Sequence, residues 1–153
     1  MSLLKYCSLK EVNEDDLLAL LNDERIREHL VEHDTFDKIK LRSWVEDKVQ
    51  LNKVEGCRVL AIKQNGVLIG WCGIQLEGND YELAIIIGSS HWGAGKQVFN
   101  DLMSWAKELG HKEVVIHLLD SRSEYKYLEK IATEVSKCKI MKRKFTTYRL
   151  AVC

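Results

Sequence analysis

An Asn65-Gly66 pair between two β-rich runs is the feature that most constrains how this chain can fold. The two runs cover residues 57–64 and 67–76. Because both residues of the pair tolerate positive φ angles, they suit the two-residue turn of a β-hairpin. A third apolar run, residues 81–87, follows after a Gly-Asn-Asp turn, and its unbroken apolar segment is typical of a strand covered on both faces. The middle of the chain therefore predicts three consecutive strands.

Helical patterns lie before and after these strands. The predicted helices run from a cap at Asn13, from Asp23 or Glu24 to residue 32, from Asp34 or Thr35, from Gly95 to a cap at Gly110, and from Ser123 to about residue 132. Further strands are predicted at residues 3–9, 113–120, 134–141 and 145–152. Antiparallel hairpins with one strand–helix–strand crossover predict an α+β fold. We expect a single three-layer domain, residues 1–153, with helices flanking a central mixed, mostly antiparallel sheet.

Composition narrows the classes of protein to which the chain can belong. The formal net charge is zero, which gives no bulk attraction to nucleic acid or anionic lipid, so we expect neither as a partner. No apolar run approaches the roughly 18 residues of a membrane span, and the N-terminus does not read as a signal peptide. Five cysteines without a C-x-x-C pair argue against a disulfide framework and suit a reducing compartment. We therefore expect a soluble, cytoplasmic protein.

The stretch between residues 85 and 97 predicts an anion site. A buried strand ends there, two close glycines follow, and an amphipathic helix starts. Amides at a helix start face one point, with the helix dipole behind them, which suits a pyrophosphate, and Lys96 adds a positive charge. The stretch is not a P-loop, because Gln97 stands where that motif needs Ser or Thr. It is not a dinucleotide fingerprint, because Val98 stands where a glycine is needed.

Residues 92–97, Trp-Gly-Ala-Gly-Lys-Gln, resemble the acyl-coenzyme A loop of GNAT-type N-acetyltransferases. The family motif reads Gln or Arg, two residues, Gly, one residue, then Gly or Ala. Trp92 replaces the first of these residues and Gln97 replaces the last. The element order from about residue 3 to 152 also resembles the GNAT-like acyl-CoA N-acyltransferase fold. With two helices before the hairpin, the layout is most similar to the ribosomal-protein and polyamine acetyltransferase branches.

The resemblance implies a site for acetyl-CoA, the expected acetyl donor, with coenzyme A as the product. Backbone amides of the loop would bind the pyrophosphate, and the preceding strand would pair with the pantetheine arm as an added strand pairs at a sheet edge. The implied cofactor-binding residues are Ile85, Ile86, Ile87, Trp92, Gly93, Ala94, Gly95, Lys96, Gln97 and Asp120, of which the last replaces a family asparagine. A tight strand–helix junction without a ligand would also use these glycines.

Two side chains are candidates for the proton transfers of acetyl transfer to an amine. Tyr127 follows Asp120 by seven residues, where the resemblance implies a general acid toward the coenzyme sulfur; alternatively, its ring packs on the sheet. Glu82 starts the central strand, where the resemblance implies a base that deprotonates the amine through water. A carboxylate beside apolar residues can have a raised pKa, which suits a base, although acids at strand ends are mostly ordinary surface groups. His117 is a weaker candidate for this task.

A second motif points to metal chemistry and is set aside. His29, Glu32 and His33 match the H-x-x-E-H pattern of inverted zinc peptidases. The two histidines would lie one helical turn apart, but the site needs a third protein ligand that the pattern does not supply. We expect no metal.

These observations predict an acyl-CoA-dependent N-acetyltransferase that moves an acetyl group directly from acetyl-CoA to a primary amine. The acceptor would be a small-molecule amine or a peptide N-terminus, and we allow for a homodimer. One alternative keeps the fold and coenzyme site but has lost catalysis and acts as a regulatory or interaction domain. Gln97, Asp120 and an Ile131-Ala132 pair in place of Gly-Phe favour it. Another alternative, a nucleic-acid or protein-binding module built on the basic residues between 137 and 149, lacks interleaved exposed aromatic residues.

The charge of the acceptor follows from an acidic stretch near the N-terminus. The resemblance places the N-terminal helices along the acceptor side of the cleft, where their acids would attract a cation. The basic run near the C-terminus would favour an anion instead. We expect a cationic acceptor, because helices can direct several carboxylates inward whereas alternate strand residues face away. The acids are Asp23, Glu24, Glu28, Glu32, Asp34 and Asp37.

Overall fold

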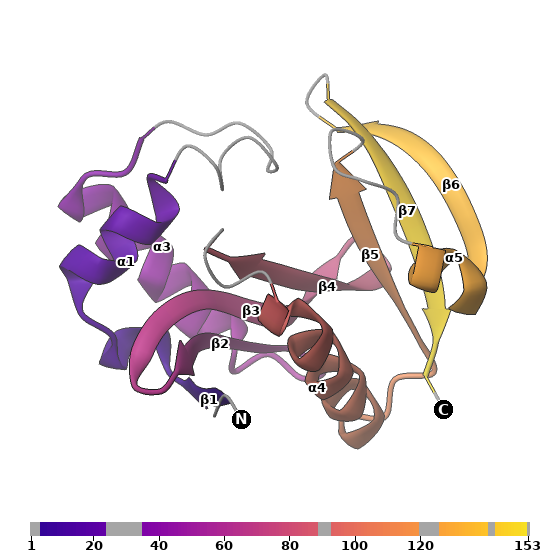
Figure 1. The fold of residues 1–153 in the computed structure, drawn as a ribbon, viewed down its shortest axis with the longest axis horizontal. Helices are drawn as coiled ribbons and strands as arrows, with labels where there is room; N and C mark the ends of the chain where they lie inside the picture. The colour runs from indigo at the N-terminus through magenta and orange to yellow at the C-terminus, as the bar shows by residue number, and fades with distance from the viewer. Residues whose placement is uncertain (1–3, 24–34, 89–92, 120–125, 141–142, 153) are drawn as a thin grey trace.

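Seven strands form one mixed sheet. The computed structural model describes residues 4–23, 35–88, 93–119, 126–140 and 143–152, and the sheet order in this part of the chain is β1-β2-β3-β4-β5-β7-β6. All neighbouring strands are antiparallel except β4 and β5. The strands are β1 Leu4–Cys7, β2 Arg58–Gln64, β3 Val67–Glu77, β4 Asp80–Ile87, β5 Glu113–Leu119, β6 Ala132–Ile140 and β7 Arg143–Ala151 (Figure 1).

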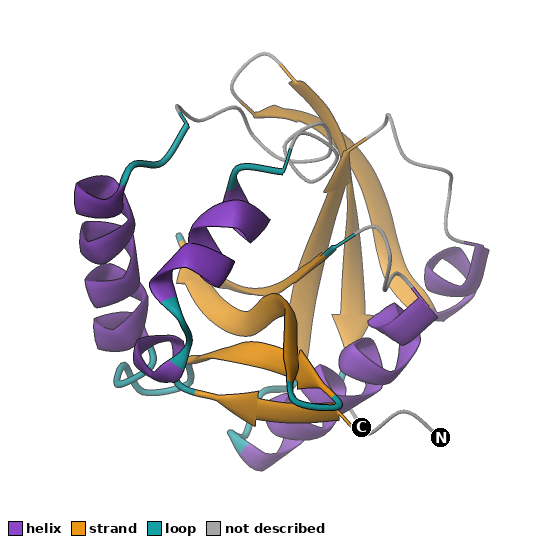
Figure 2. Ribbon diagram, turned by 60° about the vertical axis from the view of Figure 1, so that its left-hand side comes forward, coloured by secondary structure: helices purple, strands orange, loops and turns teal. Residues whose placement is uncertain are grey.

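Helices cover both faces of this sheet (Figure 2). They are the 3-10 helix η1 Leu9–Glu11 and the α-helices α1 Glu14–Leu21, α3 Lys38–Leu51, α4 Gly95–Glu108 and α5 Lys126–Ile131. None of the described helices combines the length and the apolar character that crossing a membrane requires. The predicted three-layer α+β fold with a mixed, mostly antiparallel sheet is confirmed.

The Asn65-Gly66 hairpin is confirmed. Both residues have positive φ angles, 53° and 83°, and Gln64 pairs with Val67 on either side of the turn. The glycine that ends α4 is confirmed as well. Gly110 has a φ angle of 86°, and its amide donates to the carbonyl of Lys107 at 3.1 Å. These turns depend on local backbone angles, which the sequence encodes directly.

Side-chain caps start α1 and α3. Asn13 Oδ1 accepts from the amides of Asp15 and Asp16 at 2.8 and 3.1 Å, so the predicted cap of α1 is confirmed. The prediction that α3 starts from Asp34 or Thr35 is wrong. The helix begins at Lys38, and Asp37 Oδ1 accepts from the Lys40 amide at 2.7 Å.

A long-range contact explains the later start of α3. The side-chain amide of Asn22 donates to the carbonyl of Phe36 at 2.9 Å, and Asn22 Oδ1 accepts from the Phe36 amide at 2.8 Å. Both backbone groups of Phe36 are therefore bound outside the helix. Asp34 itself, the predicted helical segment up to residue 32 and the predicted cap at Ser123 lie outside the described residues.

Each face of the sheet carries its own core. On one face, Val98 and Leu102 of α4 pack against the sheet and are 0% exposed. On the other face, Leu17 of α1 and Leu41 of α3 pack in a second cluster with strand residues, including Trp71. Burying each such side chain contributes about 1.5–3 kcal/mol relative to leaving it exposed. The two cores hold α4 on one face and α1 and α3 on the opposite face.

Strand β4 runs through the centre of the sheet and serves both cores. Leu83 and Ile87 are buried in the α4-side core, whereas Ala84 is buried in the core under α1 and α3. Ile85 and Ile86 are half-buried, one on each side. The sequence predicted a strand covered on both faces, and this alternation confirms it. The same alternation places Glu82 on the α1 and α3 side.

Candidate functional site

The site is built around the edge of β4 that faces β5. These strands are parallel, and the register between them in the described chain consists of the single pair Glu82 and Val115. Beyond this pair, the arrows of β4 and β5 run apart (Figure 1). The family resemblance implied that Ile85, Ile86 and Ile87 bind the cofactor. They lie on β4 after Glu82, the residue that pairs with β5. A strand edge of this kind can pair with an extended ligand, as in β-strand addition.

The loop that follows β4 leads into α4. Gly93 and Ala94 precede the helix, and Ala94 occupies the N-cap position without a side-chain hydrogen bond to the helix. The N-cap side chain therefore makes no hydrogen bond to the amides of the first turn. Lys96 and Gln97 are exposed on the first turn. Trp92, the first residue of the motif, lies outside the described residues.

The two glycines of the loop leave open space. A Cβ built on Gly93 or Gly95 would meet no described atom within 4 Å, and neither residue has a positive φ angle. Packing within the described chain therefore does not account for glycine at these positions. Glycine at these positions leaves room for a ligand to approach the backbone closely. The prediction that this loop binds the pyrophosphate of coenzyme A is taken up below as a proposal.

Of the two predicted proton-transfer groups, Glu82 and Tyr127, the structure describes only the side chain of Glu82. Tyr127 lies in α5, but its side chain and the whole of Asp120 lie outside the described residues. Glu82 is described and half-buried at the start of the divergence between β4 and β5. The motif formed by His29, Glu32 and His33 is also outside the described residues.

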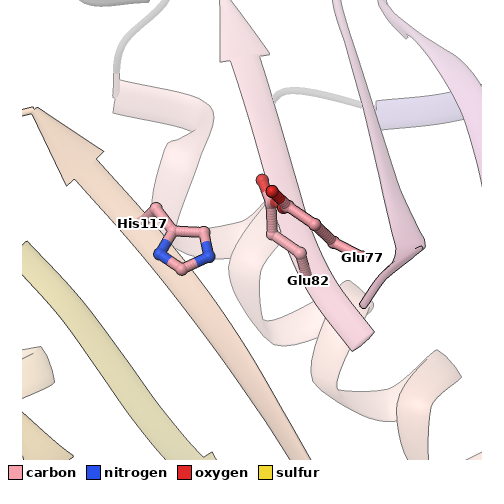
Figure 3. Close-up of side chains that lie close together, drawn as sticks. All are labelled: Glu77, Glu82 and His117. Carbon is pink, nitrogen blue, oxygen red and sulfur yellow. The ribbon is translucent and has the colours of Figure 1, made fainter. Parts of the chain in front are cut away.

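Glu82 belongs to a cluster of three titratable side chains. Glu77 at the end of β3, Glu82 on β4 and His117 on β5 each offer one nitrogen or oxygen atom, and these atoms lie within 4.8 Å of one another. Figure 3 shows the two carboxyl groups close together, with the His117 ring beside them. His117 Nδ1 lies 2.6 Å from Thr147 Oγ1 on β7. The cluster joins side chains from β3, β4 and β5 at the point where β4 and β5 separate.

Burial and mutual repulsion change the titration of this cluster. Burial is the largest cause that raises the pKa of Glu82, to about 8, followed by the hydrogen bond and the negative charge of Glu77. Lys48 of α3 acts in the opposite direction on Glu82. Burial lowers the pKa of His117, so its ring is mostly neutral near pH 7. Glu82 is therefore a carboxyl group that gains and loses its proton near neutral pH.

A match to a protein-family model identifies the family of this chain. Residues 8–122 match the model of the acetyltransferase (GNAT) domain, which is most of the chain. The chain belongs to the GNAT acetyltransferase family. No curated protein shows significant sequence similarity to it.

Solved structures of GNAT acetyltransferases share its fold at low sequence identity. One is a Salmonella typhimurium acetyltransferase that modifies the N-terminal serine of ribosomal protein L7/L12, with 14% identity, a TM-score of 0.76 and coverage of 99% of this chain and 95% of that one. Another is a Vibrio cholerae spermidine N-acetyltransferase in complex with CoA and spermine, with 13% identity, a TM-score of 0.75 and the same coverage. A third, the putative acetyltransferase yncA of Salmonella typhimurium with acetyl-CoA, has 15% identity, a TM-score of 0.66 and coverage of 100% and 95%.

Two tryptophan side chains of this GNAT domain pack beside Lys48. Trp44 of α3 and Trp71 of β3 stand edge to face with their ring centroids 5.4 Å apart. Lys48 Nζ lies 4.9 Å from the Trp71 ring centroid and donates to Gln75 Oε1. Burial lowers the pKa of Lys48, and the charge of Glu82 opposes this change. Two indole rings and one partly buried cation therefore pack together here.

Sequence reasoning missed Glu77 and Lys48 as members of the site. A signal for Glu77 existed, since a Gly78-Asn79 turn pairs Glu77 with Asp80, and Glu82 follows Asp80 on the same face. Diagonal neighbours on such a hairpin lie within reach of long side chains. Lys48 gave no comparable signal, because its position over Trp71 depends on how α3 packs against the sheet.

Proposed function

We propose that the chain is an acetyl-CoA-dependent N-acetyltransferase that transfers an acetyl group directly to a primary amine. The observation that carries the proposal is the edge of β4 beyond Glu82, followed in the chain by the start of α4, where Gly93, the N-cap Ala94 and Gly95 place no bulky side chain. Membership in the GNAT family and the acetyl-CoA and CoA complexes of structural neighbours support it. Residues 1–153 would work as one domain in the cytoplasm, where the unbonded thiols of Cys7, Cys57 and Cys72 are stable.

On this proposal, the chain holds the donor mainly through its backbone. Ile85, Ile86 and Ile87 bind the extended arm of the coenzyme, and the amides between Gly93 and Gln97 bind its pyrophosphate. Trp92 and Asp120 belong to the same proposed binding set. Acetyl-CoA supplies the acetyl group already activated as a thioester. The protein therefore needs to orient the amine and move two protons.

Glu82 is the proposed base for the amine. Its pKa near 8 makes its ionised form a stronger base than an ordinary carboxylate, so it takes a proton from an ammonium group more readily. The proton leaves the amine nitrogen through a water molecule and arrives at a carboxylate oxygen of Glu82. Tyr127 on α5 is the proposed acid that returns a proton to the departing sulfur. His117 is retained as a weaker candidate for the base.

We propose a cationic amine or a peptide N-terminus as the acceptor. The structural neighbours point to both kinds of amine, since one was solved with spermine and another modifies an N-terminal serine. In the described chain, the carboxyl groups of Glu77 and Glu82 at the β4–β5 divergence supply negative charge toward a cation. We also retain a homodimer as a proposal, which analytical ultracentrifugation tests.

The test is to incubate the protein with acetyl-CoA and a panel of amines, following free thiol and acetylated product. The panel contains spermidine, a peptide with an N-terminal serine, and an anionic amino acid. Activity should favour the cationic and peptide amines in low salt and fall as ionic strength rises. Binding of coenzyme A without transfer to any amine would support the alternative of a domain that has lost catalysis. Preference for the anionic amine would contradict the proposed acceptor class.

A further inference from the structure

We propose that Glu77 is a positioning residue for Glu82: its carboxylate accepts a hydrogen bond from the protonated carboxyl group of Glu82 and so makes Glu82 a stronger base. This inference rests on the proposed function, in which Glu82 receives the proton of the amine. The carboxyl groups of Glu77, at the end of β3, and Glu82, on the neighbouring β4, lie within 4.8 Å of each other and of His117 (Figure 3).

The hairpin geometry explains why the two carboxyl groups meet. Glu77 pairs with Asp80 across the β3–β4 turn, and Glu82 stands two residues further along the same face. Glu77 is exposed, whereas Glu82 is half-buried. Two carboxylates so close repel each other, and one proton between them removes the repulsion and adds a hydrogen bond. The exposed member can then exchange the proton with solvent.

The charged groups around Glu82 come from four other elements. Glu77 raises its pKa, and Lys48 of α3, held against Trp71 and Gln75, lowers it. His117 of β5 is the third member of the cluster, held by Thr147 of β7. Asp80 of β4 and Arg149 of β7 act on His117 with opposite signs. Within the described chain, Glu77 is therefore the neighbour that opposes ionisation of Glu82, and Lys48 is the neighbour that favours it.

The proton transfer balances within this arrangement. Before the transfer both carboxyl groups are ionised. One N–H bond of the ammonium group breaks, a water molecule relays the proton, and an O–H bond forms on Glu82, which then donates a hydrogen bond to Glu77. The pair keeps one negative charge, and the neutral amine is ready for acetylation. The proton returns to solvent through the exposed carboxyl group of Glu77.

A carboxyl titration measures the effect without any acceptor. Protein labelled with ¹³C in glutamate side chains is followed by NMR from pH 4 to pH 10, and the Glu82 resonance is assigned by its loss in Glu82→Gln. In the unmodified chain its midpoint should lie near pH 8. Glu77→Gln should lower the midpoint by one pH unit or more, because the charge is removed and glutamine can donate to ionised Glu82. Lys48→Met should raise the midpoint. Glu46→Gln, on the exposed side of α3, is the matched control and should leave it unchanged.

A pH–rate profile with acetyl-CoA and spermidine links the titration to catalysis. Glu77→Gln should move the acidic limb of kcat/KM to lower pH and reduce the plateau rate at high pH by roughly 10-fold, since a weaker base transfers the proton more slowly. Glu77→Asp should restore part of both effects. Glu82→Gln should remove the acidic limb together with most of the activity.

The outcomes separate the inference from the proposed function. An unchanged Glu82 midpoint in Glu77→Gln overturns the inference, whether or not spermidine is acetylated. A lowered midpoint together with full activity of Glu82→Gln overturns the base assignment and, with it, the positioning role. If no amine is acetylated by the unmodified chain, the proposed function fails, and the inference fails with it even where the carboxyl groups share a proton.

Discussion

The two edges of β4 meet their neighbours very differently. Toward β3, all eight residues of the strand are paired, from Gly70 with Ile87 to Glu77 with Asp80. Toward β5, the described register is one pair, Glu82 with Val115. The first edge is a closed structural contact, and the second is the edge to which we assign the coenzyme. The comparison suggests a division of roles: pairing with β3 along one edge stabilises β4, and the edge toward β5 is the one we propose for binding.

The glycines on the two sides of β4 repeat this contrast. A Cβ on Gly70 would meet the Ile86 carbonyl oxygen at 1.9 Å, so β3 and β4 approach too closely for any side chain. A Cβ on Gly93 or Gly95, after the strand, would meet no described atom within 4 Å. Glycine at residue 70 is explained by packing, whereas we assign the glycines at residues 93 and 95 to the proposed approach of the coenzyme. Four substitutions test the account of the two edges of β4 and of the proposed site.

Gly95→Glu should have the largest effect, because it places a carboxylate where we assign the pyrophosphate. Two like charges about 4 Å apart repel by about 4 kcal/mol near a protein surface, so coenzyme A affinity should fall roughly 100-fold or more. Isothermal titration calorimetry measures the affinity. Gly95→Ala separates bulk from charge. Its Cβ meets no described atom but would enter the space assigned to the ligand, so it should bind coenzyme A more weakly than the unmodified chain and more tightly than Gly95→Glu. Equal binding by Gly95→Glu would remove the loop from the site.

Tyr127→Phe tests the proposed acid on α5. Turnover with acetyl-CoA should fall by roughly 10²-fold while coenzyme A affinity stays the same, which is the pattern for losing a proton donor. Tyr81→Phe is the control, because Tyr81 packs against His111 with ring centroids 4.1 Å apart and has no proposed catalytic role. An unaltered rate in Tyr127→Phe would assign this tyrosine to packing.

Gly70→Ala tests the edge of β4 that pairs with β3. The added methyl group clashes with the β4 backbone, so the free energy of unfolding should fall by about 1–3 kcal/mol, as for other overpacked sites. Gly93→Ala, by comparison, should change it by less than about 0.5 kcal/mol. Urea denaturation of both variants measures the difference. Equal stability losses would show that the two edges are not the distinct environments described here.

Arg149→Met tests the ion pairs that join β4 and β5 near the point where the strands separate. Its effect should be the smallest of the four. Arg149 of β7 donates to Asp80 of β4 at 3.0 Å and to Glu113 of β5 at 2.6 Å, so it connects the two strands near their only described pair. These side chains are 30–45% exposed, so the loss in unfolding free energy should be about 0.5–1 kcal/mol. Arg42→Met, which removes an exposed ion pair with Glu14, is the control in the same urea assay. A loss above about 2 kcal/mol would mean that this junction is a main source of stability.

The features that the sequence predicted well are local. The Asn65-Gly66 turn and the Gly110 cap depend on the backbone angles of one or two residues. The buried stripe of α4 follows from residue spacing alone, and Val98 and Leu102 are fully buried as expected. The GNAT family was recognisable because its motif consists of adjacent residues, and the family model confirms that recognition. The positions of the motif's glycines and of the strand before it can therefore be predicted from adjacent residues.

The features that the sequence did not predict depend on distant contacts. The start of α3 is set by Asn22, which binds Phe36 from 14 residues away. The single β4–β5 pair depends on how two strands separated by α4 approach each other. The proximity of Lys48 to Trp71 and Glu82 depends on how α3 packs on the sheet. Glu77 lies between these cases, because hairpin register would have revealed it.

The most direct test of the central claim is an amide NMR titration of the ¹⁵N-labelled chain with coenzyme A. We predict that the signals of Ile85, Ile86 and Ile87 and of residues 93–97 shift together with one dissociation constant. Signals from the paired residues Cys72 and Ile74 of β3, on the closed edge, should change little. Absence of any shift at millimolar coenzyme A, or shifts confined to residues away from β4 and the start of α4, would contradict the assignment of this edge to the coenzyme.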